Sequence, residues 1–258
     1  MSENLVIIPT YNERENVARM VETVFRLPLP FHILIVDDGS PDGTAEVVRD
    51  LQNLYPQTLH LIEREGKLGL GTAYVCGFRW GLERSYRYIF EMDCDFSHNP
   101  EDLLRLHREL AEGRADLVVG SRYVRGGRLE NWPADRILLS RGASLYVQTI
   151  TWMPVKDPTA GFVGYRREVL ETIDLDLIRF IGYAFQIEMK FAAWQLGFRV
   201  REIPITFTDR IEGHSKMSKG IVKEAIFAVL LMRLRSFFRS YARPATSEKV
   251  TPEPSRQK

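Results

Sequence analysis

Short apolar segments alternate with longer helical patterns through the first half of the 258-residue chain, and this alternation limits the fold more than any other feature. The apolar segments lie at residues 5–8, 32–36, 59–62, 88–92 and 116–119. Continuous apolar runs are typical of strands buried on both faces, and a helix between two strands allows them to pair in parallel. We therefore expect an α/β fold with a mostly parallel central sheet flanked by helices.

The patterns between these strands predict helices. They cover residues 13–25, residues 42–54, and a stretch from the glycine-rich loop at 66–71 through residue 81. A further helix is expected to begin near Pro100, because the first helical position tolerates a residue without an N–H. This order of strand, helix and strand is the reason to expect helices on both faces of the sheet.

Past residue 120 the alternation weakens. The expected elements there are helices at 137–152, 184–196 and 220–240, a strand at 162–165, and an edge strand at 199–208. The helix at 220–240 would be about 30 Å long at 1.5 Å per residue. Residues 241–258 are rich in Pro, Ser, Thr and charge, a composition typical of a disordered tail. We expect one domain at 1–219, then this helix and the tail.

Polar residues follow three of the expected strands. They are the run from Thr10 to Glu13, the pair Asp37 and Asp38, and the acids around Cys94. Asp and Asn also serve as turn residues and helix caps, so one such cluster would carry little information. In a parallel sheet all three clusters fall at the carboxyl ends of the strands, where ligands bind. Together they indicate a binding site.

Asp93 and Asp95 are separated by one residue just past the expected strand at 88–92. Carboxylate oxygens suit Mg²⁺ or Mn²⁺, which keep several waters and take other ligands from phosphates. Such a metal would neutralise charge that develops on a diphosphate leaving group. The alternative is a turn that caps the helix near Pro100.

Composition and spacing exclude several other classes. The net charge is +1, so no global charge favours nucleic acid, and none is expected as a partner. Five His and two Cys show no zinc-ligand spacing, and we expect Cys76 and Cys94 to be free thiols. The run from Gly69 to Tyr74 lacks the last glycine of a dinucleotide-binding fingerprint and follows the third strand instead of the first.

The motifs resemble those of the family 2 glycosyltransferases, and within them the dolichol-phosphate (polyprenol-phosphate) mannosyltransferases. The resemblance covers about residues 4–220. The matching segments are VIIPTYNE at 6–13, IVDDGS at 35–40, GLGTA at 69–73, MDCDFSHNP at 92–100 and GSRY at 120–123. The first two segments are typical of the wider family, and the whole set is specific to this group.

The resemblance implies a GT-A fold whose catalytic domain is residues 1–219, with a metal ion and a sugar nucleotide at the carboxyl ends of the strands. Residues implied to hold the guanosine part of the donor are Pro9, Tyr11, Glu13, Val36 and Asp38. The implied metal ligands are Asp93 and Asp95, with Ser97 near the same ion. Some relatives carry Gln at the position of Ser97, and the family often has Ala at the position of Cys94, which lies within the donor-binding segment.

Residues of the second half are implied to bind the two phosphate groups. Arg122, Arg136 and Ser140 stand where relatives bind the lipid phosphate, and a guanidinium group matches phosphate oxygens in a bidentate way. Residues 207–217 resemble the family's loop over the donor, from which Arg210 and Lys216 would reach the diphosphate. The catalytic residues implied by the resemblance are Asp95, Arg210 and Arg122.

The resemblance implies a metal-dependent, inverting hexosyltransferase that moves mannose from GDP-mannose to a polyprenyl or dolichyl phosphate. The acceptor is already an anion near pH 7, since the second pKa of a phosphate monoester is about 6. No strong general base is then needed, and positioning with charge neutralisation is expected to dominate. Two alternatives stay open: a transferase for another donor such as UDP-glucose or another acceptor, and a non-catalytic sugar-nucleotide-binding subunit.

The C-terminal quarter suggests a membrane surface. Residues 199–258 contain 13 Lys/Arg and 6 Asp/Glu, a net charge of +7, whereas the rest of the chain carries −6. The expected helix at 220–240 is apolar in its first half and basic in its second, which suits the headgroup region of an anionic leaflet. An ordinary packing helix is the alternative.

The N-terminus has no signal-peptide pattern, and no run of about 18 uncharged apolar residues is present. We therefore expect a cytoplasmic protein, peripheral on the cytoplasmic face of a membrane. Some relatives without spans require small membrane subunits, so such subunits are candidate partners.

Overall fold

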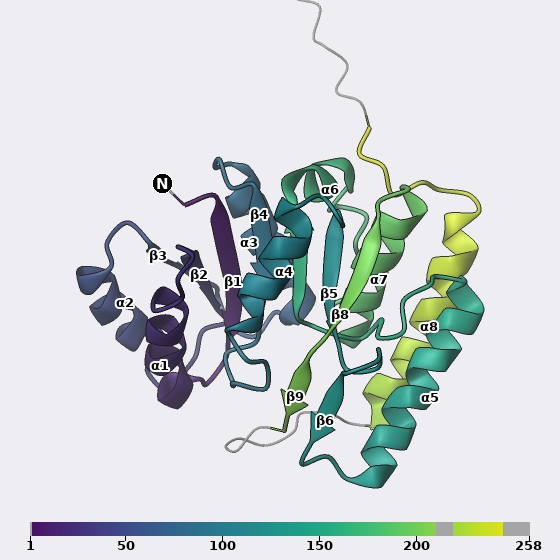
Figure 1. Cartoon of the computed structure of the whole chain (residues 1–258), viewed down its shortest axis with the longest axis horizontal. Coiled ribbons are helices and arrows are strands. Elements are labelled where there is room, and N and C mark those ends of the chain that lie inside the picture. Colours follow the sequence, from purple (N-terminus) through teal and green to yellow (C-terminus); the bar gives the residue numbers. More distant parts are fainter. Residues whose placement is uncertain (1, 210–218, 245–258) are drawn as a thin grey trace, which may run out of the picture.

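A seven-stranded sheet forms the centre of the computed structural model, which describes residues 2–209 and 219–244. Helices cover both faces of this sheet (Figure 1). In spatial order the strands are β3 (Leu59–Glu63), β2 (His32–Asp37), β1 (Asn4–Thr10), β4 (Tyr88–Glu91), β7 (Val163–Arg166), β5 (Leu117–Ser121) and β8 (Val200–Pro204). Only β7 runs antiparallel to its two neighbours. The expected mostly parallel α/β sheet is confirmed.

The helices follow the predicted order with small shifts at their ends. They are α1 (Arg14–Phe25), α2 (Thr44–Leu54), α3 (Leu70–Leu82), α4 (Asp102–Ala111), α5 (Ala134–Thr151), α6 (Arg167–Thr172), α7 (Tyr183–Gln195) and α8 (Lys219–Ser236). The short helix α6 was not predicted, because six residues give too little periodicity to detect. Helix α5 ends one residue before Trp152, which adopts a left-handed conformation with φ of 60°.

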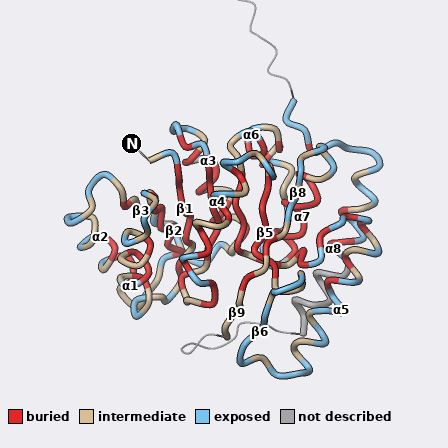
Figure 2. The backbone as a smooth tube through the Cα atoms, viewed as in Figure 1, coloured by how far each residue is buried: buried red, intermediate tan, exposed pale blue. Residues whose placement is uncertain are grey.

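Each face of the sheet carries its own hydrophobic core. Figure 2 shows the central strands largely in red, as buried segments. In β1, Leu5 and Ile7 pack on the side of α3 and α7, whereas Val6 and Ile8 pack on the side of α1, α2 and α4. Successive side chains of a strand point to opposite faces. A strand buried on both faces must therefore be apolar at every position, which explains the continuous runs in the sequence.

The predicted edge strand at 199–208 is wrong as a single element. The strand β8 ends at Pro204, and β9 (Thr206–Thr208) pairs with β6 (Arg128–Glu130) in a separate two-stranded sheet. Proline has no N–H with which to continue the ladder. The chain therefore leaves the main sheet at this point, and the small sheet projects beyond it (Figure 1).

The expected disordered tail begins too early. Tyr241 is buried in the core beside α7, and its hydroxyl donates a hydrogen bond to Glu188. Ala242 forms a β-bridge with Ile173. The segment at Tyr241 and Ala242 is thus packed against the domain. Burial of the aromatic ring of Tyr241 is favourable, and the polar composition of the residues that follow gave no sign of it. The remainder of the predicted tail lies outside the described residues.

Helix α8 packs against α5 and α7, and its residues Val229 and Met232 are buried in the same core as α3 and α7. It ends at Ser236, four residues before the predicted end. Within residues 2–209 and 219–244, no helix combines the length and the apolar character needed to cross a bilayer. The division of the chain at residue 219 stays a prediction.

Two helical glycines offer a matched test of packing. A Cβ added to Gly71 in α3 would lie 2.7 Å from the carbonyl oxygen of Phe180 and 2.9 Å from the Phe185 side chain, whereas one added to Gly142 in α5 meets nothing within 4 Å. We expect Gly71→Ala to lower the free energy of unfolding by about 1–3 kcal/mol through overpacking. Gly142→Ala should raise the free energy of unfolding by roughly 0.5–1 kcal/mol, because alanine lowers the backbone entropy of the unfolded chain. Urea denaturation measures both, and equal effects would contradict the packing of α3.

Candidate active site

The polar clusters predicted from the sequence meet at one edge of the sheet. The strands β1, β2 and β4 are parallel and adjacent, so their carboxyl ends point the same way. Thr10 at the end of β1 lies opposite Asp37 at the end of β2, and the Thr10 hydroxyl donates a hydrogen bond of 2.8 Å to the Asp37 carboxylate. This edge is therefore the candidate active site.

Asp37 and Asp38 have different surroundings. Asp37 is buried and accepts hydrogen bonds from the backbone N–H of Ser40 at 2.8 Å and its hydroxyl at 2.6 Å, besides the one from Thr10. It holds the turn after β2. Asp38 forms a buried ion pair with Arg64, whose Nε lies 2.7 Å from Oδ1. The pair compensates the Asp38 charge, so Asp38 shapes the site together with Arg64.

Arg64 also fixes the glycine-rich loop. It donates to the Thr72 hydroxyl at 2.8 Å and to the carbonyl oxygen of Gly69, while the N–H of Gly69 donates to Asp38. No motif pointed to Arg64, because its role depends on β3 lying beside β2. It ties the first turn of α3 to the end of β2.

The other predicted donor residues divide into exposed and buried groups. The Tyr11 ring is partly exposed, and Nζ of Lys67 lies 4.6 Å from its centroid. The N–H of Glu13 donates to Thr44 at the start of α2. Pro9 is partly buried, and Val36 is fully buried in the core. The side chain of Val36 cannot reach a ligand, and only its backbone lies near the site.

The acids after β4 flank a buried thiol. Asp93 and Asp95 are partly exposed, and Cys94 between them is buried in the core, which raises the pKa of its thiol. Oδ1 of Asp95 accepts a hydrogen bond of 3.0 Å from the N–H of Ser97, whose side chain is buried. Cys94 therefore contributes packing, whereas the two acids on either side of it remain partly exposed.

The donor set fits a hard divalent cation. Among the described residues, no group of three or more His, Cys, Asp or Glu could enclose a metal, so Asp93 and Asp95 would supply only part of its shell. That incomplete set suits Mg²⁺ or Mn²⁺ with water and phosphate as further ligands. The buried Tyr74 hydroxyl has no hydrogen-bond partner. Burial, followed by the charge of Asp93, raises the pKa of this phenol.

A buried polar network lies behind these acids. Glu91 accepts hydrogen bonds from the Tyr165 hydroxyl and the Gln186 amide, and the amide oxygen of Gln186 accepts one from Lys190. Burial raises the pKa of Glu91 to about 7 and lowers the pKa of Lys190 to about 8. The sequence offered a sign of this network, since both charges interrupt apolar segments. It anchors the end of β4 to α7.

Arg122 makes a forked ion pair with a buried carboxylate. Its Nε and Nη2 donate to Asp157 at 2.7 and 2.6 Å, its backbone N–H donates to the same group at 2.9 Å, and Nη2 reaches the Thr159 hydroxyl. The backbone N–H groups of Lys156 and Asp157 are held in turn by Glu202. The Arg122 guanidinium, predicted to bind a phosphate in a bidentate way, thus binds the Asp157 carboxylate in this way.

The other predicted acceptor residues lie one turn apart on α5. Arg136 stacks on Trp132, with 3.8 Å from its guanidinium carbon to the ring centroid, and pairs with Asp209 at 2.7 Å. The Ser140 hydroxyl accepts a hydrogen bond of 2.6 Å from Tyr123. Arg122 lies 5.6 Å from the centroid of the same Trp132 ring. The structure therefore brings all three predicted residues together, and Trp132 was not predicted.

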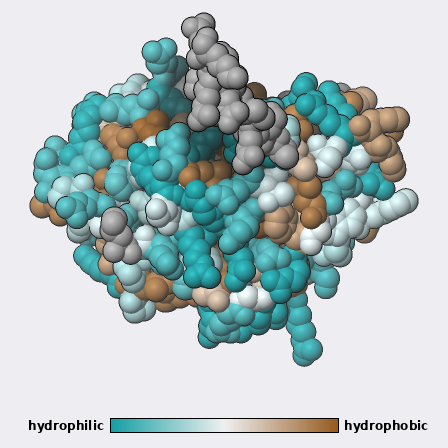
Figure 3. All heavy atoms as spheres, turned by 90° about the horizontal axis from the view of Figure 1, so that it is seen from above, coloured by the Kyte–Doolittle hydropathy of each residue, from teal (hydrophilic) through white to brown (hydrophobic). Residues whose placement is uncertain are grey.

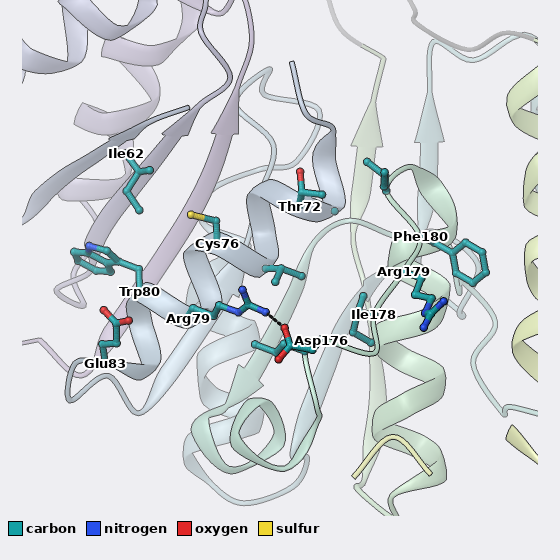
Figure 4. A pocket seen from close by; sticks show the side chains of 14 residues that line it. Ile62, Thr72, Cys76, Arg79, Trp80, Glu83, Asp176, Ile178, Arg179 and Phe180 are labelled. Atoms are coloured by element: carbon teal, nitrogen blue, oxygen red, sulfur yellow. Dashed lines mark hydrogen bonds and ion pairs between the residues drawn. The ribbon is translucent and has the colours of Figure 1, made fainter. Parts of the chain in front are cut away.

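The remaining predicted residues, Arg210 and Lys216, lie outside the described residues. A separate groove of about 520 Å³ runs along α3, where Arg79 and Asp176 form an ion pair across it (Figure 4). None of the predicted site residues lines this groove. It shares only the first turn of α3, at Gly71 and Thr72, with the neighbourhood of the candidate site.

The family model for glycosyl transferase family 2 matches residues 5–174 of the chain. The chain belongs to this family, and the sheet with its acidic pair after β4 is the GT-A fold of a glycosyltransferase.

Two curated relatives specify the group further. The chain is 49% identical over 225 residues to polyprenol monophosphomannose synthase of Mycolicibacterium smegmatis, covering 87% of this chain and 84% of the relative. It is 46% identical over 225 residues to undecaprenyl-phosphate mannosyltransferase of Micrococcus luteus. The match covers 87% of this chain and 91% of that relative.

Solved structures support the fold. The mannosyltransferase PcManGT of Pyrobaculum calidifontis, in complex with GDP-Man and Mn²⁺, has a TM-score of 0.58 at 17% identity, covering 94% of this chain and 66% of that one. A second solved structure is glucosyl-3-phosphoglycerate synthase of Mycobacterium tuberculosis in complex with Mn²⁺, UDP and glucosyl-3-phosphoglycerate. It has a TM-score of 0.61 at 16% identity, and the match covers 89% of this chain and 78% of that one.

His98 makes stability depend on pH. Its ring is buried between those of Phe162 and Phe207, with centroid distances of 5.0 and 5.2 Å. Burial lowers the pKa of His98 to about 4. Below pH 6.5 the unfolded chain binds a proton that the folded chain does not, so stability falls as the pH falls toward 4. We expect a loss of about 3 kcal/mol across this window.

The variant His98→Phe keeps the ring but cannot titrate. Urea denaturation from pH 7 to 4.5 should show a shallower loss of stability in the variant than in the wild type. Identical pH profiles would show that His98 is not buried in its neutral form.

Proposed function

We propose that the chain transfers mannose from GDP-mannose to a polyprenyl phosphate and forms polyprenyl-phosphate mannose. The observation that carries this proposal is the identity of 49% over 87% of the chain with polyprenol monophosphomannose synthase. That span includes both acids after β4 and the three residues around Trp132. The UDP-bound structures are below 20% identical, so they support the fold and give no reason to prefer a UDP-sugar donor.

The donor would occupy the edge formed by β1, β2 and α3. Tyr11 offers a ring face for the guanine base, and Glu13 offers acceptor oxygens for its edge. Asp38 is held by Arg64 and Gly69 and would define one wall of this pocket. The nearby Lys67, whose Nζ lies 4.6 Å from the centroid of the Tyr11 ring, gives the pocket positive charge for a nucleotide diphosphate.

Asp93 and Asp95 would hold Mg²⁺ or Mn²⁺ at the diphosphate. When bound, the ion would neutralise charge that develops on the leaving group. The hydrogen bond from the Ser97 N–H orients the Asp95 carboxylate, which supports a positioning role for Ser97 in place of direct metal binding. Arg210 and Lys216 are proposed to contact the same diphosphate.

The acceptor phosphate would lie near Arg136, Ser140 and Arg122. Because Asp157 occupies the fork of Arg122, we propose that Arg122 acts there by fixing the loop after β5. The acceptor is already anionic, so these residues need only orient one oxygen toward the sugar C1. A single displacement then expels the diphosphate and inverts the anomeric centre.

A lipid acceptor requires contact with a membrane, and the structure offers a suitable face. Large apolar side chains are exposed on α5 and α8 and just after each of these helices. They are Leu138, Leu139, Leu145, Trp152, Phe227, Leu230, Leu231, Leu234, Phe237 and Phe238. Figure 3 shows brown and tan patches at the right-hand end, the side on which α5 and α8 lie in Figure 1. We propose that this face, with Arg233 and Arg235 beside it, rests on the lipid surface.

The transfer itself is tested with radiolabelled GDP-mannose, polyprenyl phosphate and Mg²⁺, followed by extraction into organic solvent. We expect the wild-type chain to transfer label into the organic phase and Asp95→Asn to lose about 100-fold or more of this activity, the scale of one lost electrostatic contact. Asp50→Asn, an exposed position on α2, should keep normal activity. Normal turnover of Asp95→Asn at saturating Mg²⁺ would contradict the metal assignment, and transfer only from UDP-glucose would contradict the donor.

The stereochemistry of the product tests the single displacement. An α-linked donor should give a β-linked polyprenyl-phosphate mannose, which the anomeric coupling in an NMR spectrum of the product identifies. A retained α-linkage would require two displacements and would overturn the mechanism, while leaving the substrates unchanged.

A further inference from the structure

A small cavity of about 220 Å³ lies between α5 and the segments that follow β5 and precede β7. Its lining consists of Tyr123, Arg141, Ser144, Leu145, Gln148 and Lys156. Four of these residues, Arg141, Ser144, Leu145 and Gln148, stand at positions i, i+3, i+4 and i+7 of α5 and therefore share one stripe of the helix. None of the six belongs to the predicted donor, metal or acceptor residues, although Tyr123 hydrogen bonds to Ser140.

Two cations without a carboxylate partner line this cavity. Arg141 and Lys156 are exposed, and neither forms an ion pair with the described residues, in contrast to Arg122 and Arg136. Arg141 lies 5.8 Å from the centroid of the Tyr123 ring. The backbone of Lys156 is held by Glu202 and Gln148, at 2.8 and 3.4 Å, and no acidic side chain lines the cavity. The cavity is therefore positive and open to an anion.

A buried hydroxyl of the lining has no partner. The Ser144 side chain is 2% exposed, and its Oγ forms no hydrogen bond, although a helical serine can usually donate to the carbonyl four residues earlier. Buried polar atoms are nearly always hydrogen-bonded, so an orphan beside two cations points to an absent partner. An anion that enters the cavity would accept this hydrogen bond after a small shift of the helix side chains.

The rim of the cavity is apolar on one side. Leu145 lines the cavity and is 65% exposed, and it continues into the exposed leucines of α5 that form the proposed lipid-facing surface. A ligand with a charged head and a hydrocarbon tail fits this combination of a positive cavity and an apolar rim. A free anion would leave the rim unused.

We propose that this cavity binds the phosphate group of a membrane lipid, at a site separate from the transfer centre. The phosphate lies between Arg141 and Lys156, and its hydrocarbon part lies against Leu145. The acceptor lipid and an anionic phospholipid offer the same phosphate chemistry, so either can fill the cavity. The site places α5 against the lipid surface, and its occupation does not require GDP-mannose.

The test measures binding of the full chain to vesicles by sedimentation, without donor or metal. Neutral phosphatidylcholine vesicles are used alone, with phosphatidate, or with polyprenyl phosphate. The double variant Arg141→Gln/Lys156→Gln should bind both phosphate-bearing vesicles at least tenfold more weakly. Arg125→Gln/Arg128→Gln removes two other exposed cations and should change affinity less than twofold. Ser144→Ala, which removes no charge, should weaken binding several-fold.

The outcomes separate the sources and the proposals. A loss only with polyprenyl phosphate identifies the acceptor lipid as the ligand, and a loss only with phosphatidate identifies a phospholipid. Equal losses in the two double variants, or no effect of Ser144→Ala, would overturn the site, because general charge attraction would then explain binding. Transfer activity is not measured, so failure here leaves the proposed mannosyl transfer standing, and failed transfer leaves this site standing.

Discussion

The parallel pairing of β1, β2 and β4 is the constraint on which the rest of the structure depends. It places Thr10, Asp37 and the acids after Glu91 at one edge, although they are far apart in the sequence. Parallel strands need helical crossovers on both faces, and these crossovers bury every side chain of β1 except Pro9. Thr10, Asp37 and the acids after Glu91 accordingly lie at or just after the carboxyl ends of their strands. The parallel pairing therefore brings the polar groups at the ends of these strands to one edge of the sheet.

Charge compensation dominates the chemistry around that edge. Asp38 is paired with Arg64, Arg122 with Asp157, and Arg136 with Asp209. Two of these pairs are almost fully buried, where a lone charge would carry a large desolvation cost. The pairs link the loops after β2 and β5 to the rest of the domain, and such links favour the fixed placement of groups on which the proposed transfer depends. Asp93 and Asp95 follow β4 and are partly exposed, and carboxylate oxygens are the ligands that Mg²⁺ and Mn²⁺ prefer.

The second half of the chain carries the proposed acceptor residues and the proposed lipid-facing surface. Helix α5 carries Arg136 and Ser140 at the proposed acceptor site, Ser144 and Arg141 along the proposed phosphate cavity, and exposed leucines. Helix α8 packs beside it and adds exposed Phe and Leu side chains. The same two helices therefore connect the proposed acceptor phosphate with the proposed membrane surface.

The sequence by itself determined the parallel sheet, the order of its helices and the acidic pair, because continuous apolar runs and polar strand ends are local patterns. Resemblance alone supplied the roles of Arg122, Arg136 and Ser140. Only the tertiary structure decided that Arg64 pairs with Asp38, that Asp157 occupies the fork of Arg122, and that Val36 and Cys94 pack in the core. The break between β8 and β9 and the burial of Tyr241 were likewise decided by packing. These features depend on contacts between distant segments, and no local pattern of residues encodes which distant partner a side chain will meet.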